Sequence, residues 1–281
     1  MDSYLRLKID KLAEEQVRLV GCTAFPVDPF KIAENSNIVV EAKPPEERGA
    51  SGWLVRSGNN FGILYATHIK NDGFQRFSIS HELGHYFIEG HPEHVFRGGD
   101  IHASQAGFCS KDEVEKQADY FAASLLMPKG LFKKAMNSFS DGLAAVKGLQ
   151  TLCKASLEAT AIRYVESTSE AIGIVISKGK LVQYSSFSDE FKEIAKSRLK
   201  RGEWLPKSSC TFRMNSSEEA VFSGESVEDE ISADEWFAGL KGSISEEAIG
   251  LGSYGKTLTM LTLNAEYDED EIPAWTPKFR R

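Results

Sequence analysis

The sequence lacks the features of a membrane-bound or exported protein. No apolar run approaches the roughly 18 residues that a membrane-spanning helix needs. The opening segment, MDSYLRLKIDKLAEEQ, is charged throughout and lacks the apolar stretch of a signal peptide. We therefore expect a cytoplasmic protein that does not contact membranes.

Cysteine is scarce as well. The chain contains no C-x-x-C pair, and its cysteines are widely scattered. This pattern fits neither a disulfide framework nor a cysteine-bound zinc site, so we expect buried, reduced thiols. The residues concerned are Cys22, Cys109, Cys153 and Cys210.

Positive charge is also in short supply. Lysine and arginine total 33 against 41 aspartates and glutamates, which gives a net charge of −8. Phosphate backbones repel such a molecule, and this argues against direct nucleic-acid binding. The hydrophobic fraction of 41% is ordinary for globular domains, and 281 residues suffice for one large domain or two smaller ones.

The N-terminal part predicts two helices followed by a small sheet. Leu5, Ile9 and Leu12 recur at helical spacing between charged residues, which indicates an amphipathic helix. Asp28 can cap a second helix that begins with a proline at position 29. A β-branched run at 38–40 and two apolar runs on either side of a polar turn at 57–60 then predict strands, the last two as an antiparallel hairpin.

Two further helices are expected around polar motifs. Ser78 can cap a helix that runs from about Ile79 to Phe87. A later helix is expected to begin at Ser110, which forms a capping box with Glu113, and to end before Pro128.

The first of these helices carries HELGH at residues 81–85. His81 and His85 are four residues apart, so both imidazoles project from one helical face and can meet one ion. A catalytic zinc site normally has three protein ligands and one position open to water. Glu82 lies about 100° round the helix from His81, beside that position, where its carboxylate can act as general base.

The second helix offers the third ligand through the motif E-x-x-A-D. Glu115 shares its helical face with the small residues Ala118 and Ala122, which permit close approach to the HELGH helix, and with Asp119, which can orient a ligating histidine. Glu113 competes for the role. Two residues on a helix are about 200° apart, so both glutamates cannot face one ion, and Glu113 suits the cap instead.

The remaining histidines belong to no ligand pattern. The H-P-E-H segment follows a break at Gly90 and Pro92 and is expected on an exposed loop. We therefore expect these four residues to lie outside the metal site: His68, His91, His94 and His102.

Such a site predicts amide hydrolysis. Zinc lowers the pKa of its water towards 7 and polarises the scissile carbonyl, while Glu82 takes the proton and returns it to the leaving amine. The strand near Phe61–Ile69 is expected to lie at a sheet edge, where it can pair with an extended peptide substrate. Mn²⁺ or Fe²⁺ can occupy similar ligand sets, so zinc is the first expectation and not the only one.

The chain changes character after the metal motifs. Residues 131–168 read as helical, and 148–168 have helix-turn-helix spacing, although Lys154 and Arg163 supply too little positive charge to indicate DNA binding. From about 171 a hairpin, a charged helix near 188–201 and a late strand predict a separate unit. The expected fold class is α+β, with a peptidase domain at 1–130, a helical segment at 131–170 and a C-terminal α+β domain at 171–281, for which regulation is one candidate role.

Three segments together resemble the ImmA/IrrE family of metallopeptidases, which are of the gluzincin type. They are PVDPFKIA, QRFSISHELGHYF and EKQADYFAASLLMP, in that order, within roughly residues 15–130. The resemblance implies a zincin-like domain with one Zn²⁺ on His81, His85 and Glu115 and with Glu82 as base. It also implies that the substrate is a helix-turn-helix transcriptional repressor, whose cleavage releases repressed genes.

Three alternatives stay open. The chain could be a non-catalytic, zinc-stabilised module that binds a repressor or antitoxin, although Glu82 beside an open ligand position argues for catalysis. It could be a DNA-binding regulator built on residues 148–168, against which the acidic balance argues. It could also be a general peptidase without a regulatory target.

Overall fold

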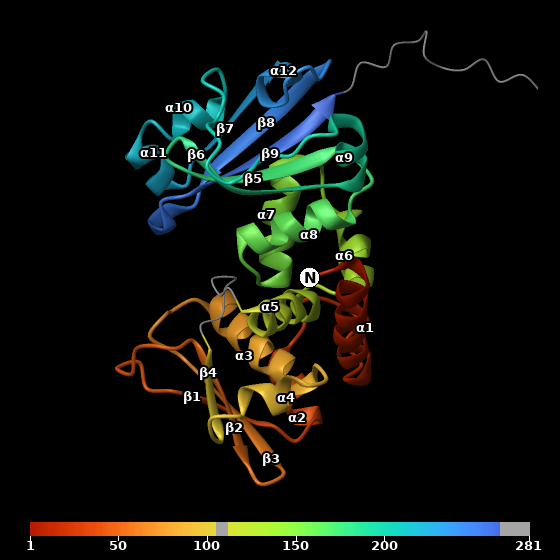
Figure 1. Ribbon diagram of the computed structural model, residues 1–281, viewed down its shortest axis with the longest axis vertical. Coiled ribbons are helices and arrows are strands. Elements are labelled where there is room, and N and C mark those ends of the chain that lie inside the picture. The colour runs from red at the N-terminus through yellow and green to blue at the C-terminus, as the bar shows by residue number, and fades with distance from the viewer. Residues whose placement is uncertain (105–111, 265–281) are drawn as a thin grey trace, which may run out of the picture. The chain divides into compact units, whose positions relative to one another are not determined.

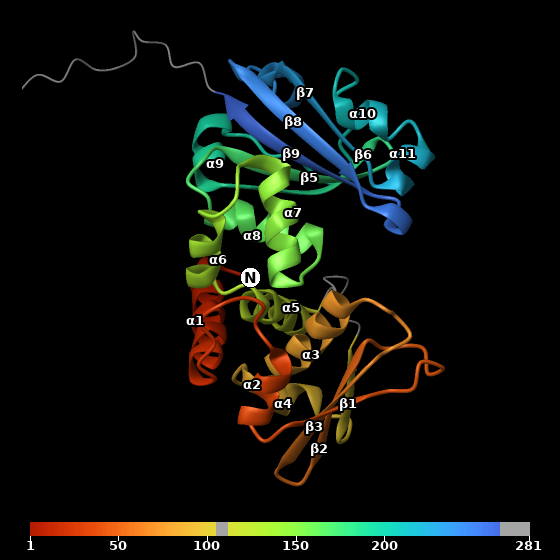
Figure 2. The ribbon, with the colours of Figure 1, turned by 180° about the vertical axis from the view of Figure 1, so that it is seen from behind.

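The computed structural model describes residues 1–104 and 112–264. The chain divides into two compact units, Met1–Ser167 and Thr168–Arg281, each with its own sheet and helices (Figure 1 and Figure 2). The predicted α+β class is therefore confirmed. Within the described residues, no helix has both the length and the apolar character to cross a bilayer.

The first unit combines a four-stranded sheet with helices before, between and after its strands. The helices are α1 (Ser3–Leu19), α2 (Pro29–Asn35), α3 (Asp72–Phe87), α4 (His91–Val95), α5 (Glu113–Leu126), α6 (Lys129–Met136), α7 (Gly142–Cys153) and α8 (Leu157–Ser167). The strands are β1 (Val39–Ala42), β2 (Gly52–Ser57), β3 (Asn60–Tyr65) and β4 (Ile101–Ser104). As predicted, the Asp28 side chain caps α2, which begins at Pro29.

The sheet order is β1-β3-β2-β4. The hairpin β2–β3 is antiparallel, β4 joins β2 antiparallel, and β1 joins β3 in parallel. The prediction that the strand near Phe61–Ile69 lies at an edge is wrong, because β1 returns to cover β3. The edges within the described residues are β1 and β4, and β4 enters the sheet only after α3 and α4.

Helix α3, which carries the HELGH motif, ends at Phe87 as predicted but begins at Asp72, a full two turns before the expected Ile79. Asn71 is its true N-cap, since the Asn71 side chain accepts a hydrogen bond from the Phe74 amide at 3.0 Å. The Ser78 hydroxyl instead donates to the Phe74 carbonyl one turn back, a bond that a helix interior satisfies.

Helix α5 is capped by Asp112, whose side chain accepts from the Val114 amide at 2.9 Å. The expected cap, Ser110, lies outside the described residues. The helix ends at Leu126, before Pro128, as predicted.

The core of the first unit lies between the sheet and the helices. Ile9 of α1, Ile63 of β3 and Leu83 of α3 each have 1% or less of their surface exposed and belong to one apolar cluster. Burial of several such side chains, each worth about 1.5–3 kcal/mol, fixes α3 against the sheet.

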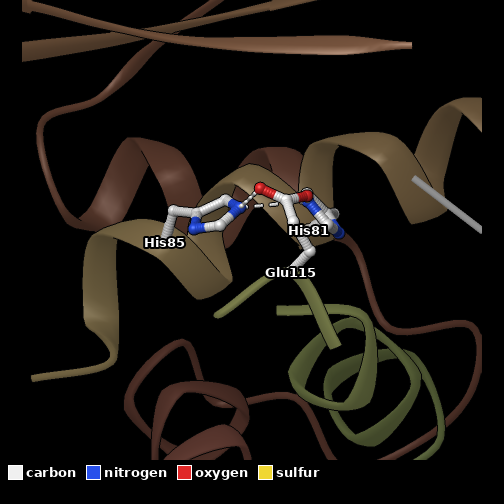
Figure 3. A group of neighbouring side chains, drawn as sticks. All are labelled: His81, His85 and Glu115. Carbon is white, nitrogen blue, oxygen red and sulfur yellow. Dashed lines mark hydrogen bonds and ion pairs between the residues drawn. The ribbon is translucent and has the colours of Figure 1, made fainter. Parts of the chain in front are cut away.

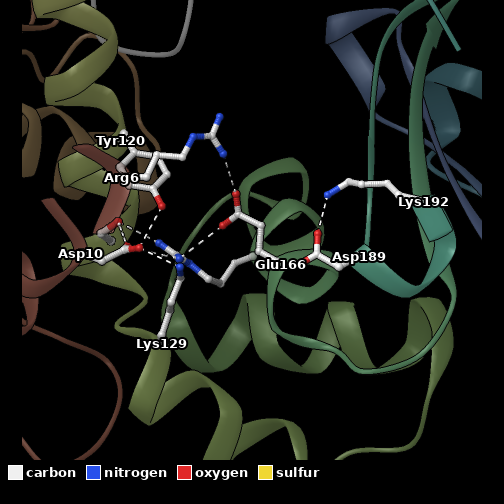
Figure 4. Close-up of polar contacts among 9 residues, drawn as sticks. Arg6, Asp10, Tyr120, Lys129, Glu166, Asp189 and Lys192 are labelled. Carbon is white, nitrogen blue, oxygen red and sulfur yellow. Dashed lines mark hydrogen bonds and ion pairs between the residues drawn. The ribbon is translucent and has the colours of Figure 1, made fainter. Parts of the chain in front are cut away.

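A buried acid ties α1 to the helices that follow the sheet (Figure 4). Asp10 accepts hydrogen bonds from Tyr120 at 2.9 Å and Ser124 at 2.7 Å, both on α5. Its carboxylate also lies 2.7 Å from Lys129 Nζ of α6 and 3.6 Å from the Arg163 guanidinium of α8. One carboxylate thus links four helices and holds α5 in place.

The predicted helical region after residue 130 is present as α6, α7 and α8, and the first unit extends through α8. Arg163, the basic residue of α8, is 2% exposed and donates to Ser124 at 3.0 Å. Lys154, in the turn before α8, lies 3.4 Å from Asp72. A guanidinium buried in internal bonds cannot contact a phosphate backbone, which agrees with the argument against DNA binding.

The second unit is built on an antiparallel sheet of order β6-β5-β9-β8-β7. Its strands are β5 (Ile172–Lys178), β6 (Leu181–Phe187), β7 (Ser226–Ser232), β8 (Ser243–Gly250) and β9 (Thr257–Asn264). Its helices are α9 (Asp189–Ala195), α10 (Cys210–Met214), α11 (Glu218–Ser223), α12 (Ala233–Trp236) and the 3-10 turn η1 (Gly252–Tyr254). The predicted hairpin and late strand are confirmed as β5–β6 and β9. The predicted charged helix is shorter than expected, because Lys196 adopts a left-handed conformation that ends α9.

The cysteines that the structure describes are free thiols. Cys153 and Cys210 are buried, as expected, whereas Cys22 is half-buried. Cys109 lies outside the described residues.

Candidate metal centre

Helices α3 and α5 approach each other closely where their polar motifs meet. A Cβ atom on Gly84 would lie 3.0 Å from Ala118 Cα and 3.2 Å from the Ala118 carbonyl oxygen. Glycine on α3 and alanine on α5 therefore allow the two backbones to come near contact. The motif side chains on either side of this crossing are brought together as a result.

Three of these side chains point toward one another (Figure 3). His81 Nε2 lies 3.1 Å from His85 Nε2 and 3.2 Å from Glu115 Oε2, and His85 Nε2 lies 3.4 Å from Glu115 Oε1. Zinc ligands at roughly 2.0–2.1 Å in a tetrahedron are about 3.3–3.4 Å apart. The two histidines face different oxygens of Glu115, and one ligand atom from each of the three residues lies within 4.8 Å of the others, so the group can hold one metal ion.

Asp119 supports one of these side chains. His81 Nδ1 donates to Asp119 Oδ1 at 2.9 Å, and Asp119 is 1% exposed. This bond keeps one proton on Nδ1 and directs Nε2 towards Glu115 and His85. Glu113, the competing acid, is exposed on the first turn of α5 and pairs with Lys116.

Glu82 is fully buried beside this group, and neither of its carboxylate oxygens has a hydrogen-bond partner among the described residues. Burial raises the pKa of Glu82 to about 7, although the nearby His81 and the Ser104 hydroxyl oppose the shift. The start of β2 comes very near: a Cβ on Gly52 would lie 2.6 Å from Glu82 Oε1. A side chain at position 52 would displace the Glu82 carboxylate from this position.

Comparison with known proteins bears directly on this arrangement. Residues 33–164, which contain α3, β4 and α5, match the family model described as the IrrE N-terminal-like domain, Peptidase M78. This region is similar to the IrrE N-terminal-like domain. The family is one of metallopeptidases, in agreement with a His-His-Glu group that can hold a metal.

The whole chain also resembles a solved structure, a Mycobacterium tuberculosis transcriptional regulator. The TM-score is 0.59 at 10% sequence identity, over 94% of this chain and 77% of the other. At that identity the likeness shows a shared fold. A search of curated proteins finds no match.

The proposed metal ligands change one another's pKa values. Burial lowers the pKa of His85 to about 4, so this imidazole is neutral and keeps a lone pair for a metal. Burial also opposes the charged form of His81, but hydrogen bonds to Asp119 and Glu115 outweigh it and raise the pKa of His81 to about 10. For Glu115, bonds to the surrounding histidines outweigh burial and hold its pKa far below the usual range. Near neutral pH the metal-free site therefore pairs a protonated His81 with an ionised Glu115, and a metal ion would displace the Nε2 proton of His81.

His102 is not one of the three residues that can hold a metal, but it contacts one of them. His102 Nε2 lies 3.1 Å from Glu115 Oε1, and its ring centroid lies 4.7 Å from that of His85. Residue spacing carries no signal for this contact, because His102 reaches the site through the pairing of β4 with β2. Only knowledge of that long-range pairing would have revealed it.

His91 is also closer than expected. Its side chain is buried at the start of α4 and not on an exposed loop, its Nε2 lies 3.2 Å from Gln117 Oε1, and its ring centroid lies 5.4 Å from that of His85. His94 is exposed on α4, in agreement with the sequence-based expectation.

Proposed function

We propose that the protein is a zinc-dependent endopeptidase with His81, His85 and Glu115 as metal ligands and Glu82 as general base. The observation that carries the proposal is the fully buried Glu82 carboxylate beside two histidines and a glutamate that can together hold a metal ion. A structural metal site has no need of such an acid, since burying an unpaired carboxylate costs stability.

When bound, the ion would supply Lewis acidity, which activates a water molecule and polarises the scissile carbonyl. Glu82 takes the proton from the attacking water on a carboxylate oxygen and gives it to the amine nitrogen as the peptide bond breaks. A pKa of about 7 suits a group that must both accept and donate a proton near neutrality. Asp119 keeps His81 in the ligating tautomer throughout. Mn²⁺ or Fe²⁺ would serve the same ligand set.

The edge strand β4 supports a peptide as substrate. Its outer side pairs with no strand among the described residues, and Ile101 on it is 66% exposed. An extended peptide can add to such an edge through backbone hydrogen bonds. Because His102 on β4 touches Glu115, a peptide held along this edge would pass close to the metal ligands.

We further infer that the substrate is a helix-turn-helix transcriptional repressor in the cytoplasm. The support is the similarity of the chain's motifs to the ImmA/IrrE peptidases and the match of residues 33–164 to the IrrE N-terminal-like family. Cleavage of a repressor would release the genes that it silences. A non-catalytic module that only binds such a repressor is the second candidate, and the same experiment separates the two.

The test compares the wild type with Glu82→Gln and with Glu93→Gln, a control at an exposed glutamate of α4. Bound metal is quantified in each, and each is incubated with the helix-turn-helix repressor encoded beside its gene, with products read by mass spectrometry. We expect metal in all three, and a discrete cut that slows about 10²–10⁴-fold in Glu82→Gln alone. Metal-loaded wild type that binds the repressor and leaves it intact would favour the binding module. Broad cleavage of unrelated unfolded proteins would favour a general peptidase.

A further inference from the structure

His102 lies on the inner face of β4 and contacts Glu115, one of the proposed metal ligands. Burial alternates along this strand, with Ile101 exposed and Ser104 buried. His102 is paired with Leu54 of β2, a core residue with none of its surface exposed, and directly opposed residues project from the same face of a sheet. The strand therefore directs the imidazole towards α3 and α5.

The contact that His102 makes is selective for one oxygen of Glu115. Glu115 Oε2 lies 3.2 Å from His81 Nε2, whereas Oε1 lies 3.1 Å from His102 Nε2 and 3.4 Å from His85 Nε2. A carboxylate that gives a metal one oxygen leaves the other in need of a hydrogen-bond donor, and an imidazole N–H supplies one. Without a donor, the second oxygen is free to turn onto the metal as well.

We propose that His102 is a positioning residue that donates a hydrogen bond to Glu115 Oε1 and thereby restricts this ligand to one-oxygen coordination. The proposal rests on the metal centre of the proposed function. His102 supports Glu115 as Asp119 supports His81, and the fourth position on the metal stays open for a water molecule. Loss of the donor would let Glu115 bind through both oxygens and occupy part of that opening.

The experiment uses the full chain with three substitutions. His102→Leu removes the donor, His102→Gln keeps an amide N–H near the position of ring Nε2, and His94→Leu is a control at an exposed histidine. Zinc affinity is measured by competition with a chromophoric chelator, and coordination number by the visible absorption of the Co²⁺-loaded protein. We expect His102→Leu to weaken zinc binding about 10–100-fold and to show the weaker absorption of a five-coordinate ion. His102→Gln should restore most of both, and His94→Leu should match the wild type.

Several results would overturn the proposal. Wild-type affinity and absorption in His102→Leu would show that the contact is dispensable. If both position-102 variants lose affinity equally and X-ray absorption shows one nitrogen ligand fewer, His102 is itself a ligand. Should circular dichroism show that His102→Leu is unfolded, His102→Asn replaces it, since its shorter amide cannot reach Glu115.

Failure of the proposed function is distinguishable from these outcomes. A wild type that holds no metal removes both the metal centre and the role of His102. A wild type that holds metal, responds to His102 substitution as expected and cleaves no protein leaves the positioning role intact and refutes the peptidase.

Discussion

The three proposed ligands are oriented by different means. His81 is fixed by its hydrogen bond to Asp119, and Glu115 by its contact with His102. His85 Nδ1 has no hydrogen-bond partner among the described residues, and its ring is instead enclosed by the rings of His81, His91 and His102, with centroids 4.8, 5.4 and 4.7 Å away. Packing thus replaces a polar partner for one ligand of the three.

Outside the metal site, we expect the free energy of unfolding to depend strongly on Asp10. Replacing it by asparagine removes the charge that faces Lys129 and Arg163, and breaking a buried ion pair on one side typically costs about 3–5 kcal/mol. Glu15→Gln, on the exposed side of the same helix, breaks only a surface pair with Arg18 and should cost less than about 1 kcal/mol. Urea unfolding measures both, and equal losses would refute the role given to Asp10.

Asp10 also makes the stability of the protein depend on pH. Burial raises the pKa of Asp10, but hydrogen bonds from Lys129 and Ser124 outweigh it, so the pKa in the folded protein lies below the usual 3.8. A depressed carboxyl pKa contributes stability that is present above the unfolded value and is lost as the pH falls through the folded one. Below about pH 4 the wild type should therefore lose stability more steeply than Asp10→Asn. Parallel losses in the two proteins would contradict this.

At the scale of elements, the crossing of α3 and α5 decides whether the ligands meet. We expect Gly84→Ala to weaken zinc binding and to destabilise the protein by about 1–3 kcal/mol, because the added methyl group meets the Ala118 backbone and not a movable side chain. The matched control is Gly130→Ala in α6, where an added Cβ would meet no neighbouring atom within 4 Å. That change should stabilise the helix by up to about 1 kcal/mol.

Chelator competition and thermal unfolding measure these two effects. Wild-type zinc affinity in Gly84→Ala would mean that α3 and α5 can separate without moving the ligands apart. A destabilised Gly130→Ala would mean that glycine is needed in α6 for another reason.

Sequence patterns predicted the contacts between residues that are close along the chain and missed those between distant segments. Helical spacing is local, so it sufficed to put His81 and His85 on one face and to separate Glu115 from Glu113. The start of α3 was missed because Asn71 and Ser78 are both good caps, and only the packing of the first two turns decides between them. The pairing of β1 with β3 puts β3 inside the sheet, and the pairing of β4 with β2 brings His102 to the metal site. Both pairings join strands that are far apart in the chain, and no local sequence pattern encodes their register.

At the scale of the whole molecule, every residue of the proposed site belongs to the first unit, Met1–Ser167. The family match begins at residue 33, yet α1, which precedes it, contributes Asp10 to the bonds that hold α5. The first unit is thus larger than the matched domain, and α1 is part of what positions the ligand helix.

This division predicts how a metal acts on the full chain. Binding to the native state stabilises the elements that supply the ligands, so amide hydrogen exchange should slow in α3 and α5 when zinc is added. The strands β5 and β9 of the second unit supply no ligand and should exchange at an unchanged rate. Exchange followed by mass spectrometry on the full chain measures both, with Glu82→Gln as a variant that keeps the ligands and should show the same protection. Slower exchange in β5 and β9 would show that the two units are energetically coupled, and the second unit would then be a route by which a signal could reach the metal.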